Sequence, residues 1–190
     1  MQTNKTWPGV ANAGKVADMN PGGLIVRCLG WLVVLLFVLR WWASPTVRME
    51  APPTGWRGWV PRAFWTGAAL ANLCHALLAF AIVYGWSHDT FVEEVVLRTQ
   101  ENLGISLPWL VHLTYASVIL WLLDALWSWV KPASWWGRVT LVQGGIRGLL
   151  SLALMLNVAA FADGPIRWVG VVAVTLAAAS RWCRTGCAGA

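Results

Sequence analysis

The sequence predicts an all-α fold: a bundle of five transmembrane helices in a single domain. Three observations support this prediction, namely five long apolar runs, a charged share of only 12%, and sixteen tryptophans among 190 residues. A water-soluble domain carries roughly a quarter charged residues, so this chain has too few of them to cover a soluble surface. Indole is apolar apart from one N–H donor, and it settles at the headgroup level of a bilayer. The composition therefore predicts an integral membrane protein whose first partner is the lipid bilayer.

The spans follow from the length of each apolar run. A helix needs about 20 apolar residues to cross about 30 Å of hydrocarbon. The runs predict spans over residues 24–42, 64–86, 109–130, 141–161 and 166–182. The last run is the shortest, so four spans followed by an interfacial C-terminal helix is the alternative. Residues 1–23 are predicted to form a flexible segment, residues 24–182 the membrane domain, and residues 183–190 a short tail.

Most tryptophans stand near the predicted ends of these spans, as expected of a bilayer belt. The edge positions are Trp41, Trp42, Trp65, Trp86, Trp109, Trp127, Trp129, Trp168 and Trp182. Two others, Trp31 and Trp121, fall deep inside the first and third spans, where an indole N–H needs a partner. Trp121 stands about one helical turn from Asp124, so this region is the first place to look for function.

Basic and acidic residues alternate between the segments that connect the spans. Basic residues dominate after the first and third spans, whereas residues 87–107 carry one arginine against Asp89, Glu93, Glu94 and Glu101. The positive-inside rule then predicts an outside N-terminus and a cytoplasmic C-terminus. The same distribution argues against nucleic-acid binding despite the net charge of +6, because the basic residues flank the spans and form no single patch.

The acidic segment between the second and third spans is predicted to contain a short helix. Its apolar residues Phe91, Val95, Val96 and Leu97 give residues 90–103 an amphipathic pattern. Gly104 is a suitable residue to end such a helix. We expect this helix to lie on the outer surface of the membrane.

Asp124 is the strongest candidate for a functional group, because a charge inside a span must be offset by a partner or a cavity. It belongs to a polar stripe on one face of the third span, formed with Thr114, Ser117, Trp121, Ser128 and Lys131. A similar stripe on the fourth span is formed by Gln143, Gly144, Arg147 and Ser151. Asp124 and Arg147 both lie about 10 Å from the inner end of their helices, so they are predicted to pair. Gly144 and Gly148 would permit the close helix approach that such a pair requires.

The histidines suggest two further sites, and each has a simpler explanation. His75 and His112 on neighbouring spans could ligate a haem, but their depths differ by about 12 Å, which two axial ligands of one iron do not allow. No cofactor is therefore predicted. His88, His112 and Asn157 are predicted to lie close together near the outer surface. Their spacing matches no metal signature, so a solvated acidic loop is the preferred interpretation and no metal is predicted.

Four short motifs lie between residues 84 and 129, which is about a quarter of the chain. They are Trp86-Ser87-His88, Arg98-Thr99, Tyr115 and Trp121-Leu122-Leu123-Asp124-Ala125-Leu126-Trp127. Together these motifs resemble an uncharacterised family of small bacterial multi-pass membrane proteins. The resemblance implies a bacterial host, and hence the inner membrane, and it implies that His88 and Asp124 belong to one pattern. It implies no activity.

The sequence favours a function without catalysis. It contains no Gly-x-Ser-x-Gly, His-Glu-x-x-His or Cys-x-x-Cys motif and no phosphate-binding glycine loop. The preferred function is an accessory or scaffold subunit, in which an Asp124–Arg147 contact is structural and the partners are other membrane subunits or further copies of the chain. One alternative is a small proton- or ion-coupled transporter that uses Asp124. The other is a haem- or quinone-linked redox subunit that uses His75 or His112.

Overall fold

The computed structural model describes residues 21–43, 55–137, 140–162 and 164–186, and all regular structure in this part of the chain is helical. The predicted all-α fold is confirmed. In chain order the helices are α2 (Pro21–Ala43), α3 (Trp56–Leu78) with its π-helical continuation η1 (Ala79–Val83), α4 (His88–Leu103), α5 (Leu110–Val130), α6 (Pro132–Gly137), α7 (Thr140–Phe161) and α8 (Ile166–Gly186).

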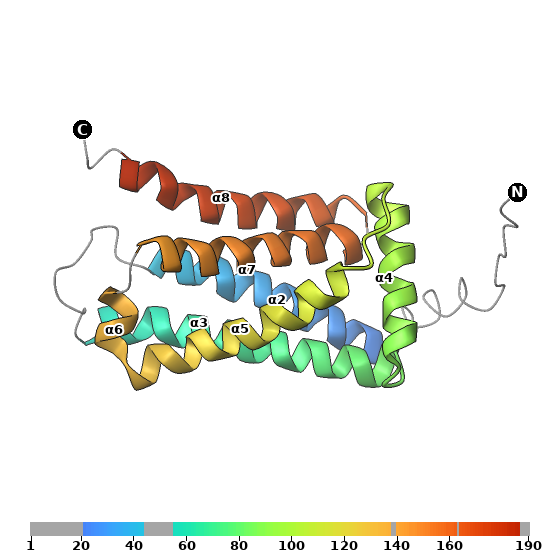
Figure 1. Cartoon of the computed structure of the whole chain (residues 1–190), viewed down its shortest axis with the longest axis horizontal. Coiled ribbons are helices and arrows are strands. Elements are labelled where there is room, and N and C mark those ends of the chain that lie inside the picture. The colour runs from blue at the N-terminus through green and yellow to red at the C-terminus, as the bar shows by residue number, and fades with distance from the viewer. Residues whose placement is uncertain (1–20, 44–54, 138–139, 163, 187–190) are drawn as a thin grey trace, which may run out of the picture.

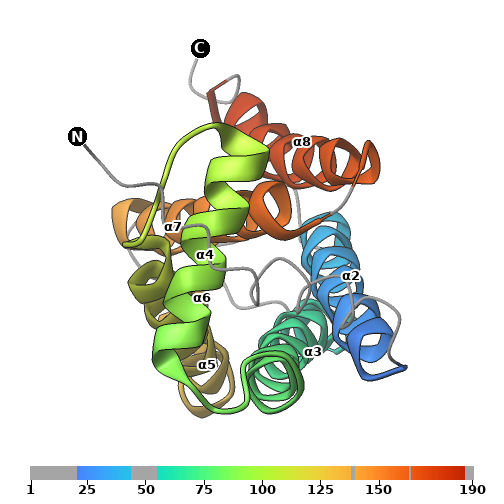
Figure 2. The same ribbon diagram turned by 90° about the vertical axis from the view of Figure 1, so that its right-hand side faces the viewer.

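Helices α2, α3, α5, α7 and α8 run side by side along the long axis, and α4 crosses one end of the bundle (Figure 1, Figure 2). We call this the α4 end and the opposite one, where the short α6 lies, the α6 end. Helices α2, α5 and α8 run from the α4 end to the α6 end, and α3 and α7 run back. Helix α2 packs on α3 and α8, and α7 packs on α5 and α8.

Four helices are long and apolar enough to cross a bilayer, as in a multi-pass membrane protein: α2, α3 together with η1, α5, and α7 from Leu141. The apolar part of α8, Ile166–Ala179, is shorter. Helix α8 nevertheless runs along α7 over most of its length (Figure 1). The choice between a fifth span and an interfacial helix therefore stays a prediction.

Two predicted boundaries are wrong. Helix α3 begins at Trp56, eight residues before the predicted start at residue 64, so residues 56–63, with Arg57 and Arg62, extend the helix beyond the apolar run. Helix α8 continues to Gly186, so residues 183–186 belong to the helix and not to a tail. Of the predicted N-terminal segment, residues 21–23 form the first turn of α2, and residues 1–20 lie outside the described part of the chain.

The predicted helix in the acidic segment is confirmed, and the ends of α4 show why it forms. At its beginning the Ser87 hydroxyl accepts a hydrogen bond from the Thr90 backbone N–H at 3.2 Å, a standard N-cap. At its end Gly104 adopts a left-handed conformation with φ of 73°, which glycine tolerates best. Phe91, Val95 and Thr99 form its buried face.

A three-residue chain of hydrogen bonds fixes α4 across the bundle. The Asn102 side-chain amide donates to the Ala160 carbonyl of α7 at 2.6 Å. The Asn102 side-chain oxygen accepts from the Arg167 guanidinium of α8, also at 2.6 Å. Asn102 therefore ties α4 to both of the last two helices.

The described tryptophans include an exposed belt and a buried core group. Exposed indoles occur at both ends of the bundle, with Trp42, Trp56, Trp59 and Trp129 near the α6 end and Trp86, Trp109 and Trp168 near the α4 end. This distribution is that of a bilayer belt. Three others, Trp65, Trp121 and Trp135, are 1–2% exposed and belong to the core. The prediction that Trp65 is a belt residue is therefore wrong.

Candidate functional site

Asp124 lies in the core near the α6 end and is held by two tryptophans. Its side chain is 2% exposed. One of its oxygens, Oδ2, accepts a hydrogen bond from the Trp65 indole N–H at 2.8 Å and another from the Trp135 indole N–H at 3.2 Å. Trp65 comes from α3 and Trp135 from α6, so the carboxylate joins three helices. An oxygen that only accepts is well matched by two groups that only donate.

Arg40 places a positive charge beside the same two indoles. It lies in the last turn of α2, and only 4% of the residue is exposed. Its guanidinium carbon lies 5.8 Å from the centre of the Trp65 ring and 5.4 Å from that of Trp135, both within cation–π distance. We call Arg40, Trp65, Asp124 and Trp135 the Arg40–Asp124 cluster. An isolated buried charge is very costly, so the opposite charges of Arg40 and Asp124 around shared indoles reduce the cost of burying each of them.

Arg147, the predicted partner of Asp124, lies on a different tryptophan. Its guanidinium carbon is 5.5 Å from the centre of the Trp41 ring. In the orientation of the Gln143 amide that satisfies both groups, Arg147 donates to the Gln143 side-chain oxygen at 2.6 Å and 3.2 Å. The Asp124–Arg147 pair stays a prediction, whereas Arg40, at the end of the first apolar run, is a core residue next to the donors of Asp124.

The other members of the predicted polar stripe bond mainly to their own helix. The Ser117 hydroxyl donates to the Thr114 carbonyl at 2.8 Å, and the Ser128 hydroxyl donates to the Ala125 carbonyl at 2.6 Å. Trp121 is buried, and its ring centre lies 5.1 Å from that of Trp65. Its N–H has no hydrogen-bond partner among the described residues. Trp121 thus packs against the cluster through its ring and does not donate to Asp124.

The predicted close packing at Gly144 and Gly148 does not occur within the described part of the chain. Both glycines are exposed on α7. A Cβ atom added at either position would meet no heavy atom within 4 Å. The buried Ser151, on the same helix, has a hydroxyl without a partner among the described residues.

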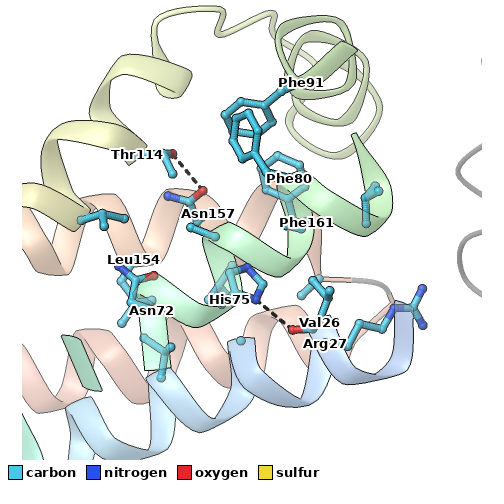
Figure 3. A pocket seen from close by; sticks show the side chains of 18 of the residues that line it. Val26, Arg27, Asn72, His75, Phe80, Phe91, Thr114, Leu154, Asn157 and Phe161 are labelled. Atoms are coloured by element: carbon cyan, nitrogen blue, oxygen red, sulfur yellow. Dashed lines mark hydrogen bonds between the residues drawn. The ribbon is translucent and has the colours of Figure 1, made fainter. Parts of the chain in front are cut away.

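A second candidate site is a cavity of about 530 Å³ between α2, α3, α5 and α7. Residues of α4 line it on one side. His75 lines it, and its Nδ1 donates to the Val26 carbonyl at 2.8 Å (Figure 3). On the opposite wall the Asn157 side-chain oxygen accepts from the Thr114 hydroxyl at 3.2 Å (Figure 3). Ser117 and Trp121 of the polar stripe also line this cavity, but Asp124 is not among its lining residues.

The three residues of the predicted outer cluster have different surroundings. The His88 Nδ1 lies 3.0 Å from the Tyr115 hydroxyl, Asn157 bonds to Thr114, and His112 is exposed on α5. Among the described residues no group of three or more His, Cys, Asp or Glu side chains is close enough to hold a metal ion. Of the two histidines weighed as haem ligands, His75 lines the cavity and His112 does not.

Tyr84, which lines the cavity beyond the end of η1, has a perturbed hydroxyl. Burial raises the pKa of Tyr84 above its ordinary value, and the negative charge of Glu94 raises it further. Arg98 acts in the opposite direction. Glu94 and Arg98 are themselves joined by an ion pair of 2.8 Å on α4.

Comparison with known proteins identifies no relative of this chain. No protein-family model matches the chain, and neither a curated protein nor a solved structure does. The resemblance to a family of small bacterial membrane proteins therefore stays a prediction.

Proposed function

We propose that this chain is a non-enzymatic membrane protein that serves as an accessory or scaffold subunit, with the Arg40–Asp124 cluster as its internal clamp. The observation that carries this proposal is the enclosure of Asp124. Asp124 is 2% exposed, and its carboxylate is bonded by the indoles of two other helices. A group held in this way fixes helices relative to each other.

The same enclosure disfavours the alternative of a proton- or ion-coupled transporter. A transported ion or proton must reach an intramembrane carboxylate through a cavity or a chain of polar groups. The cavity contains Ser117 and Trp121 but not Asp124. The ring of Trp121 packs between residues of the core, 5.7 Å from Phe37 and 5.1 Å from Trp65.

A pair of exposed glycines on α7, which we call the small-residue step, supports the proposal that a helix of a partner binds there. Gly144 and Gly148 stand one turn apart and have open space above them. In membranes, small residues allow a second helix to approach closely. Such close packing matters there because lipid provides no hydrophobic driving force for helix association. The partner would be another membrane subunit or a second copy of this chain.

We place the α6 end at the cytoplasmic side of a bacterial inner membrane. Arg57, Arg62 and Lys131 are near this end, while Asp89 and Glu93 are on α4 at the other. The positive-inside rule favours this orientation. With α8 as a fifth span, the described chain begins outside and ends in the cytoplasm.

Reconstitution into liposomes distinguishes a structural role of Asp124 from a role in proton transport. Wild-type protein and Asp124→Asn are placed in liposomes with a pH gradient, and proton flux is compared with that of empty liposomes. The proposal predicts that wild-type liposomes leak no faster than empty ones and that Asp124→Asn lowers the free energy of unfolding. Proton flux by the wild type that disappears in a folded Asp124→Asn variant would support the transporter instead.

The partner is tested on the small-residue step. Gly144→Leu and Gly148→Leu should lower the fraction of larger complexes seen by native mass spectrometry of gently solubilised membranes, because a leucine keeps the partner helix away. Gly137→Leu, at the end of α6 where a Cβ also meets nothing within 4 Å, is the matched control. Complexes unchanged by all three variants would contradict a partner at this step.

A further inference from the structure

The cavity between α2, α3, α5 and α7 has the size of a binding site for a small molecule. Its volume is about 530 Å³, and ligand sites in proteins commonly measure about 300–1,000 Å³. An apolar cavity of about 150 Å³ is enough for a benzene ring. The cavity therefore has room for one aromatic ring and an attached chain.

Two side chains of α3 offer hydrogen bonds inside it. Because the His75 Nδ1 donates to the Val26 carbonyl, the neutral ring keeps its other nitrogen, Nε2, as an acceptor. Asn72 lies three residues earlier on the same face of α3 and also lines the cavity (Figure 3). Its amide makes no hydrogen bond within the described part of the chain and offers both donors and an acceptor.

The backbone of α2 leaves space for this imidazole. A Cβ added at Gly30 would lie 3.4 Å from the Cε1 atom of His75 and 3.6 Å from its Nδ1. A larger side chain at Gly30 would therefore extend against the His75 ring. The glycine is part of the shape of the cavity.

The remaining walls are apolar and rich in rings. Trp31, Phe80, Phe161 and Trp121 line the cavity together with valines and leucines of α2, α5 and α7. Phe80 belongs to the π-helical segment η1, and such segments are frequent at functional sites. Aromatic walls of this kind bind flat rings by offset or edge-to-face contacts.

The charged side chains that line the cavity are exposed to solvent or paired. Arg27 and Glu93 are exposed, and Glu94 is paired with Arg98. The other polar side chains of the wall, among them Thr114, Ser117 and Asn157, are neutral. An ionised ligand would lose its hydration there without an opposite charge, so an uncharged one is favoured.

We propose that this cavity binds an uncharged amphipathic molecule of the alkylphenol or quinol class. Its ring hydroxyl donates to the His75 Nε2, its oxygen accepts from the Asn72 amide, and its ring packs against Phe80 and the neighbouring aromatic walls. The alkyl chain occupies the apolar part of the cavity. This binding does not depend on the proposed scaffold role, since the Arg40–Asp124 cluster is outside the cavity walls.

Calorimetric titration of the full chain in lipid nanodiscs tests the proposal. The probe is 4-octylphenol, its matched control is the methyl ether 4-octylanisole, and the heat of partition into empty nanodiscs is subtracted. We expect saturable binding of the phenol and at least tenfold weaker binding of the ether, which has no O–H to donate. His75→Phe and Asn72→Leu should each weaken phenol binding about tenfold.

The chain supplies matched controls for both variants. His112→Phe makes the same replacement on the exposed face of α5 and should leave the dissociation constant unchanged within twofold. Gly30→Val, which crowds the His75 ring, should weaken the phenol without removing any polar group. Absence of saturable phenol binding, equal binding of phenol and ether, or wild-type binding by folded His75→Phe would each overturn the proposal.

Discussion

Asp124 and Arg40 contact the same two indole rings, those of Trp65 and Trp135. The carboxylate accepts the two indole N–H groups, and the guanidinium lies within 5.8 Å of both ring centres. Each indole therefore presents its polar edge to the anion and lies within cation–π range of the cation. Through this arrangement α2, α3, α5 and α6 meet at one point, and two buried charges become part of the packing.

Removing one indole N–H while keeping a ring should destabilise the bundle. Trp65→Phe and Trp135→Phe each leave Asp124 with one donor fewer, and a lost hydrogen bond to a charged group costs about 1.5–3 kcal/mol. Chemical unfolding in detergent micelles measures the change. Trp59→Phe, at an exposed position one turn from the start of α3, is the control and should cost less than about 0.5 kcal/mol. Equal stability of all three variants would mean that the indole bonds contribute nothing.

Asn102 should control how tightly α4 is attached to the bundle. Asn102→Ala removes both of its 2.6 Å hydrogen bonds, to the Ala160 carbonyl and from the Arg167 guanidinium. Amide hydrogen exchange of α4 should then become faster, by about tenfold or more, while exchange in α5 stays the same. Glu101→Ala, at an exposed neighbouring position, should leave the exchange of α4 unchanged. If α4 exchanges at the wild-type rate in Asn102→Ala, another contact attaches it.

Part of this architecture could be predicted from the sequence, because it depends on local signals. Gly104 marks the end of α4, and the apolar runs mark the long helices, so the sequence predicts both in kind, whereas the N-cap at Ser87 comes from the structure. The polar stripe of α5 also pointed to Asp124. These features depend on residues close together in the chain.

The partners of Asp124 could not be predicted, because they come from other helices. Arg40 stands beside Trp41 and Trp42 at the end of an apolar run, a position equally typical of an interfacial residue. Trp135 lies between the predicted spans 109–130 and 141–161, and only the turn at Lys131 brings α6 back against α5. Periodicity shows which residues share a face of one helix, but not which helix covers that face.

Tyr84 should ionise only at unusually high pH. Its folded-state pKa is raised by burial and by Glu94, whereas the unfolded chain titrates near the ordinary value of about 10. Above that pH the unfolded state binds fewer protons than the folded state, so the free energy of unfolding should fall as the pH rises.

Tyrosinate absorbance measures this titration directly. The chain has two tyrosines, so Tyr115→Phe isolates Tyr84. In this variant the tyrosinate absorbance of the folded protein should increase only at a pH well above 10. In denaturant it should increase near pH 10. Folded and unfolded midpoints that coincide would show that Tyr84 is not buried next to Glu94.

The central claim is that Arg40 compensates the buried charge of Asp124, and a double-mutant cycle tests it most directly. The free energy of unfolding in micelles is measured for the wild type, Arg40→Met, Asp124→Leu and the double variant. Each single variant removes one of two opposite buried charges and should cost about 3–5 kcal/mol. Arg57→Met, an exposed arginine beside Trp56, is the control for Arg40→Met. We predict that the double variant is at least about 2 kcal/mol more stable than the sum of the two single effects implies. If the two single effects on the free energy of unfolding add up within about 0.5 kcal/mol, the account is contradicted.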